Sequence, residues 1–264
     1  MGILIMKKRW PLLLLTGVAA LALTVTACGK QSETKKPGTL TVGMEGTYAP
    51  YSYKDKNGKL TGFEVDLAKD VAKKMGMKVQ YKLTGWDSLI QGLNSNSYDV
   101  IFNNMAINPS RKKQYRFATP YIYSKSIMIT KKGSPIKNAQ DFKGKKVAEG
   151  TGTDNWDNAE KLHAKPVSSP EFNTSMQMID QGRVSGAINA QPAWQTWYAS
   201  HKDTDLQAKL IPTNIIPQGE IAPMMNKKSA KLNKQMDKAL NELRKDGTLK
   251  RLSMKYFGEN ITDK

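Results

Sequence analysis

An arginine follows a helix-start signal in the stretch Asn103-Asn-Met-Ala-Ile-Asn-Pro-Ser-Arg111. Asn108 is a favourable helix cap and Pro109 suits the first helical turn, so Arg111 falls within that turn. A cation there opposes the helix dipole and adds nothing to local helix stability. A carboxylate ligand would explain its position, because a guanidinium forms two parallel hydrogen bonds with a carboxylate. The alternative is an ordinary surface ion pair.

A second stretch suited to anions is Glu149-Gly-Thr-Gly-Thr-Asp154, which joins a predicted strand to a predicted helix. Free backbone amides at the start of a helix bind anions. A phosphate-binding loop would continue with Gly-Lys-Ser or Gly-Lys-Thr, and this sequence does not. The alternative is a tight turn without a ligand.

Three aromatic residues, Tyr48, Tyr51 and Trp86, lie in loops that follow predicted strands. Aromatic faces pack against apolar side chains and attract ammonium groups. We expect Tyr48 and Trp86 to contact a ligand and Tyr51 to pack in the core.

The sequence contains no recognisable catalytic or metal-binding set. The two histidines, His163 and His201, lie at polar helix ends, and Cys28 is the sole cysteine. Neither metal-ligand spacing nor a Gly-x-Ser-x-Gly nucleophile motif occurs. We therefore expect a protein that is not an enzyme and needs no cofactor or metal.

The first segment resembles an export signal. Lys7, Lys8 and Arg9 precede an apolar run that ends in Val-Thr-Ala-Cys28. This layout predicts a signal peptide over 1–27 and resembles a bacterial lipobox, which implies lipidation of Cys28 and anchoring to the membrane. The polar stretch up to residue 38 predicts a flexible tether.

The chain is strongly basic, with 41 Lys and Arg against 23 Asp and Glu, a net charge of +18. Without the three basic residues of the signal, the charge is +15. The basic residues are spread along amphipathic segments, which favours a solvated basic face over a nucleic-acid site. We therefore expect no nucleic-acid partner.

Strand-like and helix-like segments alternate from residue 39 onward. Alternating apolar residues predict strands over 39–44 and 79–83, and apolar residues at a spacing of four predict a helix over 63–75. The same rhythm continues to two helices at the end of the chain. This alternation predicts an α/β fold with parallel sheets, whose ligands lie beyond the carboxyl ends of the strands.

Several motifs together resemble the polar amino-acid solute-binding proteins of ABC importers. They are V-G-M-E-G-T-Y-A-P-Y, L-T-G-F-E-V-D-L-A, W-D-S-L-I-Q-G-L, Y-D-V-I-F-N-N-M-A-I-N-P-S-R, F-A-T-P-Y, D-F-K-G-K-K-V and L-R-K-D-G-T-L. The resemblance implies a two-lobed periplasmic-binding-protein-like fold, each lobe a mainly parallel sheet flanked by helices, with two crossing hinge strands. It places lobe 1 at 39–124 and 219–264 and lobe 2 at 125–218.

The resemblance also implies a ligand site between the lobes. The positions that correspond to ligand contacts are Glu45, Tyr48, Trp86, Asn103, Asn104, Ala106, Arg111, Gly152, Thr153, Asn155, Asn189 and Ala190. Arg111 matches the arginine that binds the ligand carboxylate. Members of the family usually have an Asp where this chain has Ala190, and that Asp pairs with the ligand ammonium. The departure leaves the ligand open, with cystine or another polar amino acid expected.

The resemblance implies that the chain captures an amino acid outside the cytoplasm and delivers it to the transmembrane subunits of an ABC permease. We expect a monomer, anchored through Cys28 on a Gram-positive surface rather than in a Gram-negative periplasm. Two alternatives stay open: a dehydratase-like enzyme on the same fold, which Ala190 mildly favours, and a surface adhesin, which the charge and the anchor favour.

Overall fold

A strand with alternating apolar residues organises the first lobe. The computed structural model describes Met1–Gly2 and Glu33–Lys264. Within this part of the chain, a five-stranded sheet has the order β4-β1-β5-β14-β6, and we refer to this sheet and its helices as lobe 1. Its first three strands are parallel, whereas β14 is antiparallel to both neighbours. The strands are β1 (Thr39–Met44), β4 (Lys78–Leu83), β5 (Val100–Ile101), β6 (Tyr115–Phe117) and β14 (Met224–Asn226).

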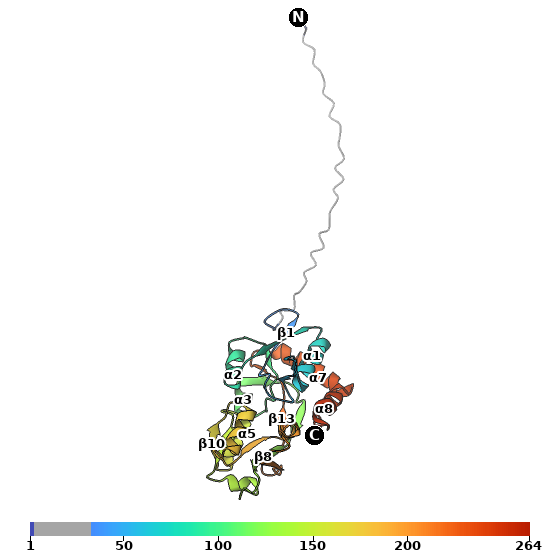
Figure 1. Cartoon of the computed structure of the whole chain (residues 1–264). Helices are drawn as coiled ribbons and strands as arrows, with labels where there is room; N and C mark the ends of the chain where they lie inside the picture. The colour runs from blue at the N-terminus through green and yellow to red at the C-terminus, as the bar shows by residue number, and fades with distance from the viewer. Residues whose placement is uncertain (3–32) are drawn as a thin grey trace. The chain divides into compact units, whose positions relative to one another are not determined.

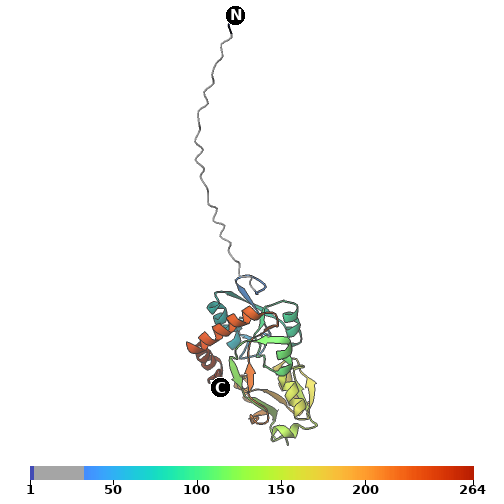
Figure 2. The ribbon, with the colours of Figure 1, turned by 180° about the vertical axis from the view of Figure 1, so that it is seen from behind.

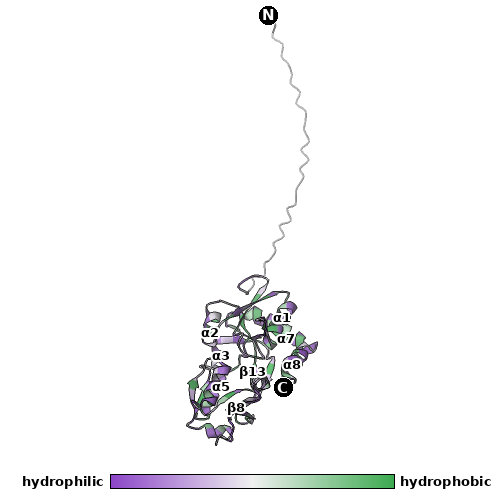
Figure 3. Cartoon of the chain, in the orientation of Figure 1, coloured by the Kyte–Doolittle hydropathy of each residue, from purple (hydrophilic) through white to green (hydrophobic). Residues whose placement is uncertain are grey.

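Helices cover this sheet on both faces (Figure 1). Helices α1 (Phe63–Lys74), α7 (Ala230–Lys245) and α8 (Thr248–Phe257) share a core with Leu40 and Val42 of β1. Helix α2 (Trp86–Asn94) packs on the opposite side in a separate cluster that includes Ile101. Seen from behind, α7 and α8 are the orange and red helices beside the C-terminus (Figure 2). Hydrophilic and hydrophobic residues alternate along the helices, as one buried face requires (Figure 3).

The loop before α1 carries a short hairpin and a glycine that the packing demands. Strands β2 (Tyr53–Lys54) and β3 (Leu60–Thr61) pair across a turn that contains Asn57 and Gly58. Gly62 then caps the start of α1 with φ of 132°, and a Cβ atom there would lie 2.2 Å from the carbonyl oxygen of Tyr51. A residue with a side chain would therefore push the start of α1 away from the loop that follows β1.

Lobe 2 is built on two groups of strands. Strand β8 lies between β11 and β12 and is antiparallel to both, whereas β9 and β10 are parallel. A bridge between Val147 and Gly186 links the two groups. The strands are β8 (Ser126–Lys131), β9 (Lys146–Glu149), β10 (Lys165–Ser168), β11 (Ala187–Ala190) and β12 (Leu206–Leu210). The helices are η1 (Ala139–Phe142), α4 (Asp154–Lys161), α5 (Phe172–Asp180) and α6 (Gln191–Ala199).

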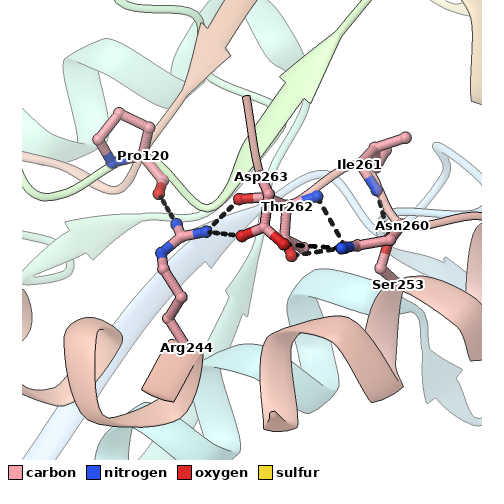
Figure 4. A network of polar contacts seen from close by, with 7 residues as sticks. All are labelled: Pro120, Arg244, Ser253, Asn260, Ile261, Thr262 and Asp263. Carbon is pink, nitrogen blue, oxygen red and sulfur yellow. Dashed lines mark hydrogen bonds and ion pairs between the residues drawn. The ribbon is translucent and has the colours of Figure 1, made fainter.

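Two paired strands connect the lobes. Strand β7 (Ile122–Ser124) leads out of lobe 1 and pairs antiparallel with β13 (Gly219–Ile221), which leads back. The last residues of the chain lie against this hinge, because Tyr123 N donates to Ile261 O at 2.7 Å and Lys264 Nζ lies 2.6 Å from Glu220. Arg244 of α7 donates to the carbonyl oxygens of Pro120 and Thr262 and pairs with Asp263 (Figure 4). The C-terminal segment thereby fastens the hinge to lobe 1.

The two-lobed α/β fold is confirmed, and one detail differs from the sequence-based expectation. Lobe 2 is a mixed sheet rather than a mainly parallel one, because β8 enters from the hinge in the direction opposite to β11 and β12. The predicted limits of the lobes, at 124/125 and 218/219, fall beside β7 and β13 and stay a prediction.

The described end of the predicted tether is held against lobe 1. Lys35 N donates to Asp99 Oδ1 at 2.6 Å, and Leu232 N, at the start of α7, donates to the carboxylate of Glu33 at 2.8 Å. Residues 33–38 are therefore part of the folded unit and not of a flexible tether. The predicted signal peptide at 1–27 and the lipidation of Cys28 lie outside the described residues, apart from Met1–Gly2. Among the described helices, none has the length and apolarity needed to cross a membrane.

We expect Arg244→Ala to lower the free energy of unfolding by about 1–3 kcal/mol. The carbonyl oxygens of Pro120 and Thr262 and the carboxylate of Asp263 would each lose a hydrogen-bond donor. Unfolding in urea measures the change. Lys234→Ala, an exposed site on the same helix, is the control and should change stability by less than about 0.5 kcal/mol. Equal losses in the two variants would contradict the role of Arg244 at the hinge.

Candidate functional site

A cavity of about 90 Å³ lies between the lobes, with room for several water molecules. Its wall combines loops at the carboxyl ends of β1, β5, β9 and β11 with the start of α5, as expected for an α/β fold. The residues that line it are Glu45, Thr47, Tyr48, Trp86, Asn103, Asn104, Ala148, Glu149, Gly150, Thr153, Asp154, Asn155, Ser169, Pro170, Glu171, Phe172, Ser175 and Asn189.

On the lobe 1 side, Glu45 is fixed by a reciprocal pair of hydrogen bonds. Asn103 Nδ2 donates to Glu45 Oε2 at 2.6 Å, and Glu45 N donates to Asn103 Oδ1 at 2.8 Å. Glu45 follows β1 and Asn103 follows β5, and these two strands are neighbours in the sheet. Burial raises the pKa of Glu45, while the bond from Asn103 lowers it. The carboxylate is therefore held in one orientation beside the cavity.

Asn104 is held by a carboxyl group that lies behind the wall. Its φ of 45° places it in the left-handed region, which Asn tolerates better than most residues. Asn104 N donates to Glu64 Oε1 at 2.6 Å, and Tyr121 Oη donates to the same carboxyl group. Burial raises the pKa of Glu64 to about 7. Glu64 is fully buried on α1, so it can position Asn104 without reaching the cavity itself.

On the lobe 2 side, three carboxyl groups approach the cavity from separate elements. Glu149 ends β9 and accepts a hydrogen bond from Ile188 N at 2.7 Å, and burial raises its pKa well above the usual value. Asp154 begins α4; burial raises its pKa, and the nearby charge of Arg111 lowers it. Glu171 precedes α5, and its side chain makes no capping hydrogen bond. This wall is therefore acidic.

Three hydrogen bonds cross from lobe 1 to lobe 2 around the cavity. Tyr48 Oη donates to Asn189 Oδ1 at 2.6 Å, and Trp86 Nε1 donates to Thr151 O at 2.8 Å. The third runs from Arg111 Nη2 to Gly152 O at 2.9 Å. The structure is thus a closed state of the two lobes, and opening would break all three bonds.

Arg111 lies at the edge of the cleft rather than in the wall of the cavity. The predicted cap is present, because Asn108 Oδ1 accepts from Arg111 N at 2.8 Å. The side chain is 6% exposed, and Nη1 donates to Ala106 O at 3.0 Å. Its guanidinium carbon lies 5.6 Å from the ring centre of Trp86. Burial lowers the pKa of Arg111, and the charge of Asp154 opposes that shift.

The structure brings most of the predicted site residues to the cavity. Those that line it are Glu45, Tyr48, Trp86, Asn103, Asn104, Thr153, Asn155 and Asn189. The other four predicted residues do not line the cavity: Ala106, Arg111, Gly152 and Ala190. The carbonyl oxygens of Ala106 and Gly152 accept hydrogen bonds from Arg111. Ala190 N donates to Asn189 Oδ1 at 2.8 Å. Tyr51 is fully buried in the lobe 1 core, as predicted. The ligand roles of all these residues stay a prediction.

Sequence reasoning missed several residues of the lobe 2 wall. Glu149 and Asp154 are the two ends of the predicted glycine-rich stretch, of which only the backbone amides were expected to bind a ligand. Glu171 and Phe172 begin α5, and no motif marks them. Phe172 packs near Tyr48, with ring centres 6.3 Å apart, and so brings α5 against lobe 1. Among the described residues, no group of three or more His, Cys, Asp or Glu side chains is suited to a metal ion.

Residues 40–259 match the family model of bacterial extracellular solute-binding proteins, family 3. A probable amino-acid ABC transporter-binding protein of Haemophilus influenzae is 37% identical over 94% of this chain and 96% of the relative. An L-cystine-binding protein, TcyJ of Escherichia coli, is 35% identical over 94% of this chain and 96% of the relative.

A solved structure of an ancestral arginine-binding protein bound to arginine superposes with a TM-score of 0.76 at 32% identity, covering 84% of this chain and 99% of that one. The fold and the sequence match therefore agree. The chain belongs to family 3 of the bacterial extracellular solute-binding proteins.

Proposed function

We propose that the chain captures a polar amino acid between its lobes and delivers it to the transmembrane subunits of an ABC importer. The observation that carries this proposal is the cavity at the strand ends, closed by three hydrogen bonds between lobes that are joined by a two-stranded hinge. A hinged closure of this kind gives a transporter two distinguishable states, one with the ligand enclosed. The relatives are named as transporter-binding proteins, which supports the same role.

Within this proposal, Arg111 binds the ligand carboxylate. Its guanidinium already links lobe 1 to the glycine-rich loop of lobe 2 through Gly152, so it lies where the two lobes meet. The amides of that loop, at the start of α4, add donors for the same anion. Tyr48 and Trp86 supply aromatic faces to the rest of the ligand.

We also propose that the N-terminal segment exports the chain and that Cys28 carries the lipid anchor. The proposal rests on the charged start, the apolar run and the Val-Thr-Ala-Cys28 sequence. We expect a monomer that the anchor holds at the membrane surface of a Gram-positive cell. Such an anchor keeps the protein close to a permease in the same membrane.

A screen of amino acids tests the capture. The protein is unfolded, dialysed and refolded to remove co-purified ligand, and its unfolding is then followed with each amino acid and with cystine. A ligand at 100 times its dissociation constant should stabilise the protein by about 2.7 kcal/mol. If no amino acid raises the unfolding temperature, the proposed function is wrong.

Arg111→Lys tests the carboxylate role while the positive charge remains. Lysine lacks the planar fork, so we expect the ligand to bind with a free energy weaker by about 1.5–3 kcal/mol, measured by calorimetry. Arg116→Lys is the matched control, since Arg116 donates to Lys227 O away from the cavity. Unchanged affinity in Arg111→Lys would remove Arg111 from the ligand site.

A further inference from the structure

The lobe 1 sheet has a second edge, at the ends of the strands that lie away from the cavity. Thr39 at the start of β1 pairs with Lys78 at the start of β4, and Asn226 at the end of β14 pairs with Tyr115 at the start of β6. Because β14 is antiparallel to β5, its carboxyl end lies on the same side of the sheet as the amino ends of β1, β4 and β5. We call this side of lobe 1 the basal edge and define it by residues 33–39, 78, 99, 112–115 and 226–234.

Exposed lysines gather on the basal edge. They are Lys35, Lys36, Lys78, Lys112, Lys113, Lys227, Lys228, Lys231 and Lys234. None of them forms an ion pair with a described residue. Lys227 Nζ donates to Lys112 O at 2.8 Å, which holds the segment after β14 beside the end of α3 (Pro109–Gln114).

The acids of the basal edge are used by the backbone. Glu33 accepts the N–H of Leu232, and the carboxylate of Asp99 accepts the N–H groups of Lys35 and Thr41. The lysines outnumber these two acids, so the basal edge carries a net positive charge. A surface of this kind attracts a partner that presents many negative charges.

The position of the N-terminal segment indicates which anionic partner lies nearest. The described fold begins on the basal edge, drawn in blue beside β1 in Figure 1. Five residues lead from Cys28 to Glu33, so even a fully extended chain spans at most about 18 Å between them. With Cys28 anchored in a bilayer, Glu33 lies within that distance of the lipid headgroups.

The attraction between lysine and an anionic membrane extends over about one Debye length, which is about 8–10 Å at physiological salt. The reach of the N-terminal segment is of the same order, so the anchor can bring the basal edge into this range. Lysines also occur on lobe 2, among them Lys143, Lys145 and Lys165. The chain leaves the fold from the basal edge, which makes this edge the basic surface tied to the membrane.

We propose that the basal edge of lobe 1 binds the anionic phospholipid headgroups of the membrane that holds Cys28. The inference goes beyond the proposed function and rests on the proposed anchor, but not on the capture of an amino acid. Lysine ammonium groups bind phosphate oxygens as point charges. Because the cavity lies at the opposite ends of β1 and β5, this contact leaves the cleft accessible from the outer medium.

Binding to lipid vesicles tests the inference in a protein that lacks the anchor. Residues 29–264 retain every hydrophobic cluster of the two lobes, because these clusters lie within residues 40–261. Sedimentation with vesicles measures the bound fraction. Vesicles that contain phosphatidylglycerol should bind the protein at least about tenfold more strongly than vesicles of phosphatidylcholine alone, and high salt should abolish the difference.

Neutralising part of the basal edge should weaken this binding. The combined substitutions are Lys36→Gln, Lys113→Gln, Lys228→Gln and Lys231→Gln, at exposed side chains that make no hydrogen bond with a described residue. We expect binding to the anionic vesicles to fall at least about tenfold, since each lysine near such a surface strengthens binding by about fivefold at most. The control makes the same change of charge on lobe 2 and should lower binding by less than about twofold: Lys143→Gln, Lys145→Gln, Lys165→Gln and Lys209→Gln.

The same two variants separate this inference from the proposed function. Their unfolding temperatures, and their stabilisation by an amino acid ligand, should match those of the unaltered protein. An equal loss of vesicle binding in both variants, or no loss in the first, overturns the inference and leaves ligand capture intact. Binding to soluble polyphosphate without binding to vesicles also overturns it, because the basal edge would then take a polyanionic polymer rather than a membrane.

Hydrogen exchange tests the contact in an anchored protein. Residues 28–264 are coupled through Cys28, the sole cysteine, to a maleimide lipid in the vesicles. We expect slower exchange at residues 33–38 and 226–234 on anionic vesicles than on neutral ones, with no difference at residues 143–149 of lobe 2. Equal exchange at the basal edge on both kinds of vesicle would show that the edge does not contact lipid.

Discussion

Three donors of lobe 1 meet three acceptors of lobe 2, and these hydrogen bonds define the closed cavity. Tyr48, Trp86 and Arg111 each lie after a strand of the lobe 1 sheet or at the start of the helix that follows it. Two of the acceptors, the carbonyls of Thr151 and Gly152, belong to the same glycine-rich loop. Because these acceptors are backbone atoms, closure depends on the path of that loop and little on its side chains. The hinge of β7 and β13, held by the C-terminal segment, sets the line about which the lobes can separate.

In the proposed function, closure and ligand capture draw on the same groups. Arg111 holds lobe 2 through Gly152 and is also the cation suited to a ligand carboxylate, so a ligand that reaches it exchanges one hydrogen-bond acceptor for another. In the acidic wall, burial and the charge of Glu171 raise the pKa of Glu45, and the hydrogen bond from Asn103 lowers it. Behind that wall, Glu64 and Tyr121 hold Asn104 in its left-handed conformation, and Asn103 orients Glu45. Hydrogen bonds within lobe 1 therefore hold Glu45 and Asn104 in place, and lobe 2 contributes the carboxyl groups of Glu149, Asp154 and Glu171.

Local patterns were enough to predict most elements of the fold and about half of the cavity wall. The strand at 39–44, the helix from Phe63 and the cap at Asn108 follow from periodicity and capping chemistry that act within a few residues. The antiparallel pairing of β8 could not be predicted in this way, because it depends on the direction in which the hinge delivers the chain. Glu171 was missed for a related reason: it is one of many acids beside a helix, and only the closing of lobe 2 on lobe 1 brings it to the wall of the cavity that Glu45 also lines. Arg111 was singled out from the sequence as an unusual cation, and its contact with Gly152 depends on the same closure.

The charge of the site is thus a property of the two lobes together. Ala190 ends β11 without a carboxyl group, and the cavity is lined by carboxyl groups from both lobes. Electrostatic attraction to a cation depends on distance and burial and not on which strand carries the carboxylate. In this cavity the carboxyl groups come from the ends of β1 and β9, the start of α4 and the residue before α5. The packing of Phe172 near Tyr48 brings the start of α5 close to lobe 1, so that Glu171 lines the same cavity as Glu45.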